Sequence, residues 1–163
     1  MRECGECRAC CEGWLVGDAF GCAFGHGKSC TFLRDGCSVY HFRPQACKNF
    51  YCAWTQELLP ESMRPDACGA MVTVERWSGG QFLRCISLGS PLGAAEKSHV
   101  LRFCEANSAP VIFDDGESSS MVGPREFLDE MVTRRARSGC SSPSGTAPAP
   151  TAAARFPLKL TGG

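Results

Sequence analysis

The alternation of apolar and polar residues in the middle of the chain predicts two β-hairpins. Two runs rich in β-branched and aromatic residues, 71–76 and 82–88, flank a Ser-Gly-Gly-Gln turn at 78–81, a pattern typical of an antiparallel hairpin. Shorter apolar runs at 111–113 and 119–122 flank Asp114-Asp-Gly-Glu117 and predict a second hairpin. The paired carboxylates of that segment are therefore interpreted as turn residues and not as an acid–base couple.

Each hairpin is followed by residues spaced as in an amphipathic helix. Residues 94–106 are expected to form one helix, whose apolar face carries Val100, Leu101 and Cys104. A second helix is expected after Gly123-Pro124, because proline suits the first helical position. Its apolar face carries Phe127, Leu128, Met131 and Val132. The order of elements predicts a β-β-α-β-β-α unit and the α+β class.

Neither a helical nor a strand period persists in residues 1 to about 54. Nine of the 13 cysteines in this 163-residue chain lie before residue 53, among many glycines and few aliphatic residues. Such a segment buries little aliphatic surface, so metal crosslinks would have to supply the missing stability. We therefore predict a small, irregular, metal-stabilised cysteine-cluster domain at 1–58, packed on the α+β region at 59–137. Residues 138–163 are rich in Ser, Pro and Ala and are predicted to be disordered.

Charge and cysteine usage narrow the classes of partner and compartment. Lysine plus arginine equals aspartate plus glutamate, 17 each, which gives no electrostatic reason to expect nucleic acid or an anionic membrane as a partner. The chain opens without the pattern of a secretory signal, and no apolar run approaches the ~18 residues of a membrane span. A cytoplasmic location is expected. Thiols are kept reduced there, so clustered cysteines indicate metal or redox chemistry more than disulfides.

The clustered cysteines fall into two halves along the chain. The first half is Cys4-x2-Cys7-x2-Cys10-Cys11, and the second is Cys30-x6-Cys37-x9-Cys47-x4-Cys52. A C-x2-C pair closes a tight turn that places two sulfurs on one tetrahedral ion. Adjacent side chains diverge, so Cys10 and Cys11 are expected to serve two metals or to let one thiolate bridge. Eight thiolates suit two four-cysteine zinc sites, one compact polynuclear site, or an iron–sulfur cluster with cysteines to spare.

The residues between the cysteines carry a resemblance to a known family. Residues 37–54 follow the pattern C-x-x-Y-x-x-R-P-x-x-C-x-x-F-x-C-x-W, after the opening C-x2-C-x2-C-C. Together these motifs, which span residues 4–54, resemble the YkgJ-type cysteine-cluster family, described as a zinc- or iron-chelating domain and sometimes as an iron–sulfur protein. The resemblance implies metal ligands at Cys4, Cys7, Cys10, Cys11, Cys30, Cys37, Cys47 and Cys52. It implies no particular reaction.

One position departs from the family pattern. A glycine followed by histidine is expected near residues 21–22, but the chain has Cys22 there, and His26 lies four residues on. Cys22 and His26 are therefore additional candidate ligands, although a spare thiol in a glycine-rich loop is the interpretation that we favour.

Other residues are given structural roles. Arg43 is interpreted as compensating the negative charge of a tetrathiolate or capping the turn set by Pro44, in preference to binding a ligand. Three aromatic residues are expected to pack around the metal: Tyr40, Phe50 and Trp54. Four isolated cysteines are expected to fill the core or lie in the tail: Cys68, Cys85, Cys104 and Cys140.

These observations predict a protein that chelates zinc or iron through cysteine thiolates. The chain contains no phosphate-loop, dinucleotide-binding or nucleophile-elbow motif, so chelation is favoured over catalysis. Two alternatives stay open: an iron–sulfur redox protein or enzyme component, and a zinc-stabilised module that binds protein or nucleic acid. Closed four-cysteine sites would favour a structural role, whereas an open coordination position would favour an enzyme.

Overall fold

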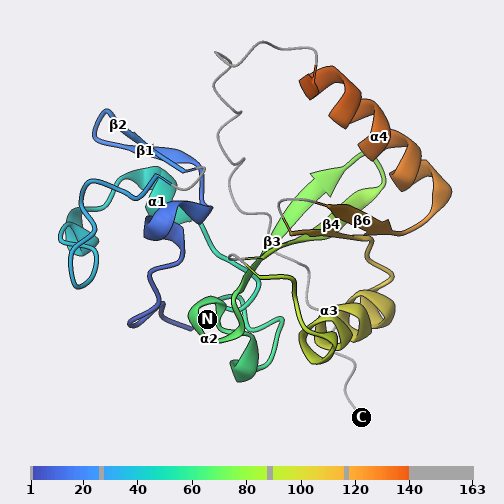
Figure 1. Cartoon of the computed structure of the whole chain (residues 1–163), viewed down its shortest axis with the longest axis horizontal. Coiled ribbons are helices and arrows are strands. Elements are labelled where there is room, and N and C mark those ends of the chain that lie inside the picture. Colours follow the sequence, from blue (N-terminus) through green and yellow to red (C-terminus); the bar gives the residue numbers. More distant parts are fainter. Residues whose placement is uncertain (1, 26–27, 88–89, 116–117, 140–163) are drawn as a thin grey trace.

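A computed structural model describes residues 2–25, 28–87, 90–115 and 118–139 of the chain. It confirms the mixed α+β class, because a four-stranded sheet and a separate two-stranded sheet are combined with helices. The cysteine-rich N-terminal part lies beside the larger sheet, and the two long helices lie against that sheet (Figure 1). None of the described helices is long and apolar enough to span a bilayer.

The larger sheet has the strand order β3-β4-β5-β6. Strands β3 (Ala70–Trp77) and β4 (Gly80–Ser87) form a long antiparallel hairpin, in register from Ala70 opposite Ser87 to Trp77 opposite Gly80. Helix α3 (Ala94–Asn107) then crosses over, so that β5 (Val111–Asp114) runs parallel to β4. Strand β6 (Ser119–Val122) pairs antiparallel with β5, and helix α4 (Arg125–Gly139) follows.

The two long helices cover opposite faces of this sheet. Neighbouring residues of a strand point to opposite faces, so Leu83 of β4 packs with Val100 of α3, whereas Phe82 packs with Phe127 of α4. The sequence pattern places Leu101 and Val132 on the apolar faces of these helices, and for both residues this prediction is wrong. Leu101 is 39% exposed and Val132 is 58% exposed. Each follows directly after a buried or half-buried position, and a helical step of about 100° turns it away from the sheet.

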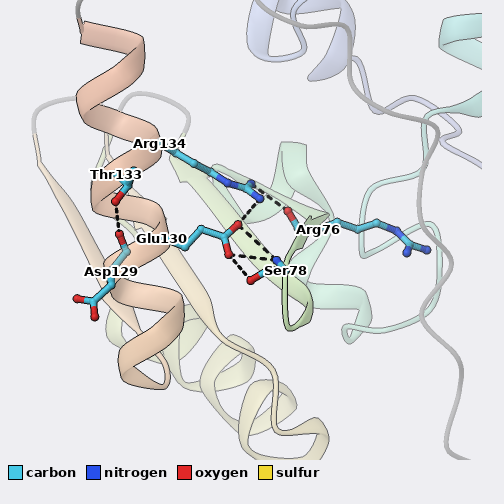
Figure 2. A network of polar contacts seen from close by, with 6 residues as sticks. All are labelled: Arg76, Ser78, Asp129, Glu130, Thr133 and Arg134. Carbon is cyan, nitrogen blue, oxygen red and sulfur yellow. Dashed lines mark hydrogen bonds and ion pairs between the residues drawn. The ribbon is translucent and has the colours of Figure 1, made fainter.

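A polar network fastens α4 to the turn between β3 and β4 (Figure 2). The Glu130 carboxylate accepts hydrogen bonds from the backbone N–H and the hydroxyl of Ser78. Arg134 forms an ion pair with Glu130 and donates to the carbonyl oxygen of Arg76 at 3.0 Å. Arg134, in the basic C-terminal part of α4, therefore helps to hold this helix against the β3–β4 hairpin.

The N-terminal part consists of short elements joined by turns, as its lack of period indicates. They are η1 (Cys10–Trp14), β1 (Gly17–Ala19), β2 (Cys22–Phe24), η2 (Tyr40–Phe42), α1 (Gln45–Asn49), η3 (Glu61–Met63) and α2 (Pro65–Cys68). A small cluster of Ala19, Phe24 and Cys30 is the buried centre of the β1–β2 hairpin.

Several residues between Ala53 and Met63 belong to the core of the larger sheet. The Ala53 N–H donates to the Val72 carbonyl oxygen of β3 at 2.7 Å, and Ala53, Leu59 and Met63 are buried in the cluster beneath α3. The packing against the sheet therefore begins before residue 59, where the sequence suggested a boundary. Helix α4 extends to Gly139, two residues into the predicted tail, and the remainder of that tail lies outside the described residues.

Candidate metal centre

The eight cysteines that the sequence proposes as ligands line one cavity. Its volume is about 250 Å³, and its wall also contains apolar residues such as Leu15, Phe24 and Trp54. Its cysteines are Cys4, Cys7, Cys10, Cys11, Cys30, Cys37, Cys47 and Cys52. Residues separated by almost fifty positions along the chain therefore meet in one place.

Local turns bring the first four of these thiols to the cavity. The N–H of Cys7 donates to the carbonyl oxygen of Cys4 at 3.0 Å, and Gly5 in this turn has φ of 55°, which glycine adopts without strain. Cys10 and Cys11 follow in the turn η1, where the Cys11 N–H donates to the Arg8 carbonyl oxygen at 2.8 Å.

The first cysteine group comprises Cys4, Cys7, Cys10 and Cys52. Burial raises the pKa of Cys10 well above its ordinary value, and the thiols of Cys52, Cys4 and Cys7 raise it further. Burial likewise raises the pKa of Cys4, with Cys52 and Cys7 as the next causes. A backbone hydrogen bond connects the segment before Cys4 with the segment after Cys52, because the Arg2 N–H donates to the Thr55 carbonyl oxygen at 2.9 Å.

The second cysteine group comprises Cys11, Cys30, Cys37 and Cys47. Burial, followed by the thiols of Cys37, Cys30 and Cys47, raises the pKa of Cys11 to about 12. Burial, followed by Cys30 and Cys37, also raises the pKa of Cys47. The N–H of Cys30 donates to the Cys11 carbonyl oxygen at 2.7 Å, which fixes these two residues side by side.

The two groups exchange members between the two halves of the sequence. Cys52 comes from the second half of the sequence motif but lies in the first cysteine group. Cys11 comes from the first half but lies in the second cysteine group, apart from its neighbour Cys10. In this division, Cys10 and Cys11 belong to different groups. The groups remain adjacent, because the Cys11 thiol also acts on Cys10.

Arg43 lies close to both cysteine groups. Its guanidinium opposes the rise in the pKa of Cys4, in the first group, and of Cys47, in the second. The guanidinium carbon lies 4.2 Å from the centre of the Tyr40 ring, which holds the side chain in a cation–π contact. This position fits the charge-compensating role that the sequence suggested.

The thiols approach one another without forming a coordination sphere. In the ranges that the structure describes, no three His, Cys, Asp or Glu side chains stand as ligands around one ion. The donor chemistry of each group nevertheless fits a tetrahedral zinc or iron ion, which four cysteine sulfurs bind at about 2.3 Å for zinc. The thiols of each group would have to turn toward a common centre and lose their protons to bind it.

The remaining described cysteines do not line the cavity. Cys22, at the start of β2, does not line it, and His26 lies outside the described residues. Cys85 and Cys104 are buried in the core beneath α3, Cys68 packs on the same core, and Cys140 lies outside the described residues. All three predicted aromatic residues line the cavity: Phe50 and Trp54 pack beside the first group, and Tyr40 lies at the wall with 41% of its surface exposed.

Two residues of this region escaped the sequence analysis. The Met71 sulfur lies 3.9 Å from the Cys10 sulfur, and the Thr55 oxygen lies 3.7 Å from the Cys52 sulfur. The sequence around Met71 indicates only a strand. Its contact with Cys10 depends on how β3 packs against the N-terminal part, which the sequence does not show.

Comparison of the chain with protein-family models, curated proteins and solved structures finds no match. The resemblance to the YkgJ-type family therefore stays a prediction that rests on residues 4–54.

Proposed function

We propose that this protein binds two metal ions, zinc or iron, through two adjacent groups of four cysteine thiolates. The observation that carries the proposal is the meeting of all eight cysteines around one cavity, in two sets of four. Core packing alone gives no reason for eight thiols to gather there, since an ordinary core needs only a few cysteines.

The electrostatics of the groups support a cation as the missing partner. Burial and neighbouring thiols raise the pKa of Cys4, Cys10 and Cys11, so deprotonation in the metal-free protein is costly. A bound cation would reverse this, because it stabilises thiolates that would otherwise repel one another. All twelve described cysteines are free thiols, which fits the proposal that the protein binds metal in the reducing cytoplasm.

Metal analysis of the purified full-length protein tests the proposal. We expect two zinc or iron ions per chain, with release of protons on metal binding at neutral pH. A protein that is folded and reduced but takes up neither metal would contradict it.

An iron–sulfur cluster is the second candidate function, and the sharing of one cavity by both groups favours it. All eight sulfurs line one cavity of about 250 Å³, so a single cluster could take ligands from both groups. Brown protein with acid-labile sulfide, isolated without oxygen, would identify this alternative, whereas colourless protein with zinc would identify simple chelation.

A further inference from the structure

Trp54 is a buried hydrogen-bond donor that lacks an acceptor. Its side chain is 5% exposed, and its Nε1 is the single buried side-chain nitrogen or oxygen in the described part of the chain without a hydrogen-bond partner. An indole N–H can only donate, and leaving a buried donor unpaired is unfavourable because the group has lost its hydrogen bonds to water. The position of Trp54 therefore calls for an acceptor close to the ring.

The surroundings of Trp54 point to a sulfur as that partner. The ring lines the cavity and packs in one cluster with Cys52, Cys10 and Met71. The Arg2 guanidinium carbon lies 5.1 Å from the ring centre, and Arg2 also donates to the Trp54 carbonyl oxygen at 3.1 Å. These contacts hold the indole in place beside the first cysteine group.

In that group, burial raises the pKa of the Cys4 and Cys7 thiols, and backbone hydrogen bonds already act on both sulfurs and oppose that rise. The sulfurs of Cys10 and Cys52 instead face groups that do not donate to them. The Cys10 thiol faces the Met71 thioether, which has no hydrogen to donate. The Thr55 hydroxyl beside Cys52 donates to the Cys52 carbonyl oxygen at 2.8 Å. A thiolate formed here on metal binding would therefore need a donor, and the nearby indole has one to give.

We propose that Trp54 donates its indole N–H to the thiolate sulfur of Cys10 or Cys52 when the first cysteine group holds a metal ion, and so strengthens metal binding at that site. The inference rests on the proposed metal binding. Trp54 is a positioning residue that acts through its sulfur acceptor. The second cysteine group has no comparable buried, unpaired donor among the described residues.

Cadmium-113 is the probe for the test, because it replaces zinc on thiolates and is visible by NMR. The full-length protein is loaded with ¹¹³Cd, and correlations to cysteine Hβ protons assign each cadmium signal to its group. In the wild type, the Trp54 indole proton is expected to show a scalar coupling to the first-group cadmium, transmitted through N–H···S.

Two variants complete the experiment. Trp54→Phe is expected to shift the first-group cadmium signals and to weaken that site about 10-fold or more in chelator competition, the usual effect of removing such a donor. The matched control is Trp14→Phe, which changes a tryptophan of the same cluster and should leave the signals in place.

The outcomes separate the two proposals. A wild type that binds no cadmium overturns both the metal-binding function and the role of Trp54. A wild type that binds cadmium at both groups but shows no indole coupling overturns the role of Trp54 alone. Because this measurement needs no variant, it decides the question even if Trp54→Phe fails to fold.

Discussion

Single residues decide how much negative charge the cavity can hold. Arg43 acts on a thiol of each cysteine group, so one guanidinium serves both. Two divalent ions on eight thiolates leave an excess negative charge, and a nearby cation favours the ionised form of a thiol. The position of Arg43 therefore has a measurable effect on metal binding.

Replacing Arg43 with glutamine should raise the thiol pKa values of Cys4 and Cys47. Protons then compete better with metal, so the pH midpoint of metal binding should move upward. A metal-binding titration against pH measures the shift. The control is Lys48→Gln, which removes the same charge from an exposed position in α1 and should leave the midpoint unchanged. Equal shifts in both variants would refute a specific role for Arg43.

The cysteines should divide into two functional classes. Cys7→Ser or Cys47→Ser should lower the metal content of the protein, because each variant loses one sulfur from a cysteine group. Alanine at Cys104 should leave metal content intact and cost about 1 kcal/mol in the free energy of unfolding, since this thiol is buried in the core beneath α3. Metal analysis and urea denaturation check the two parts, and equal metal loss in both classes would contradict the assignment.

At the scale of elements, α4 is held by packing on one side and by a polar contact at the hairpin turn. Phe127 and Met131 are buried against the sheet, while Glu130 reaches the turn between β3 and β4 (Figure 2). The hydrogen bonds from Ser78 lower the pKa of Glu130, with Arg134 as a further cause. The contact consequently depends on pH.

Glu130→Gln should lower the melting temperature at neutral pH but not in acid. The folded-state pKa of Glu130 lies below the ordinary value of 4.5, so its stabilisation is present above that value and is lost as the pH falls through the folded-state pKa. Thermal melts across this range should therefore converge for wild type and variant at low pH. Asp129→Asn is the control, because its pair with Arg125, at 3.7 Å, is exposed and contributes little. A constant difference at every pH would disprove the linkage.

At the scale of the whole molecule, the cysteine-rich part and the sheet differ in what stabilises them. The sheet and its helices contain the extensive apolar clusters, whereas residues around Ala19 and Phe24 have only a small one. The segment 53–63 packs on the sheet through Ala53, Leu59 and Met63.

A strong chelator should therefore loosen residues 4–49 of the metal-loaded protein and leave the sheet ordered. Amide NMR spectra should lose dispersion for the cysteine-rich part, while signals from residues 53–63 and from β3 to α4 persist. Retained dispersion throughout residues 4–49 would mean that packing alone orders them and that the cysteine cavity is preformed.

The metal-free protein should also lose stability in alkali. Folding raises the pKa values of Cys11, Cys85 and Cys104 from an ordinary 9.0 to about 12, chiefly by burial. Groups with raised folded-state pKa values contribute stability that is complete below pH 9.0 and is lost as the pH approaches 12. Urea midpoints measured with reductant should fall across this interval, and bound metal should protect the thiolates of the second group. A flat profile would show that these thiols ionise as freely in the folded state as in the unfolded one.

Local sequence was sufficient for the elements that neighbouring residues determine. The alternation around Ser78-Gly-Gly-Gln81 predicts a hairpin where the structure has β3 and β4, and the absence of any period in the first fifty residues predicts short elements. The candidate ligands could also be proposed from the sequence, because the density and spacing of cysteines are properties of the sequence itself.

Only the tertiary structure decided which cysteines lie together and which donors surround them. Cys52 joins Cys4 and Cys10 because Ala53 pairs with β3 and Arg2 ties the chain's beginning to Thr55. The unpaired indole of Trp54 likewise arises from contacts between distant segments. Turn and period signals come from adjacent residues, whereas the grouping of thiols depends on the path of the chain between them, which no local pattern encodes.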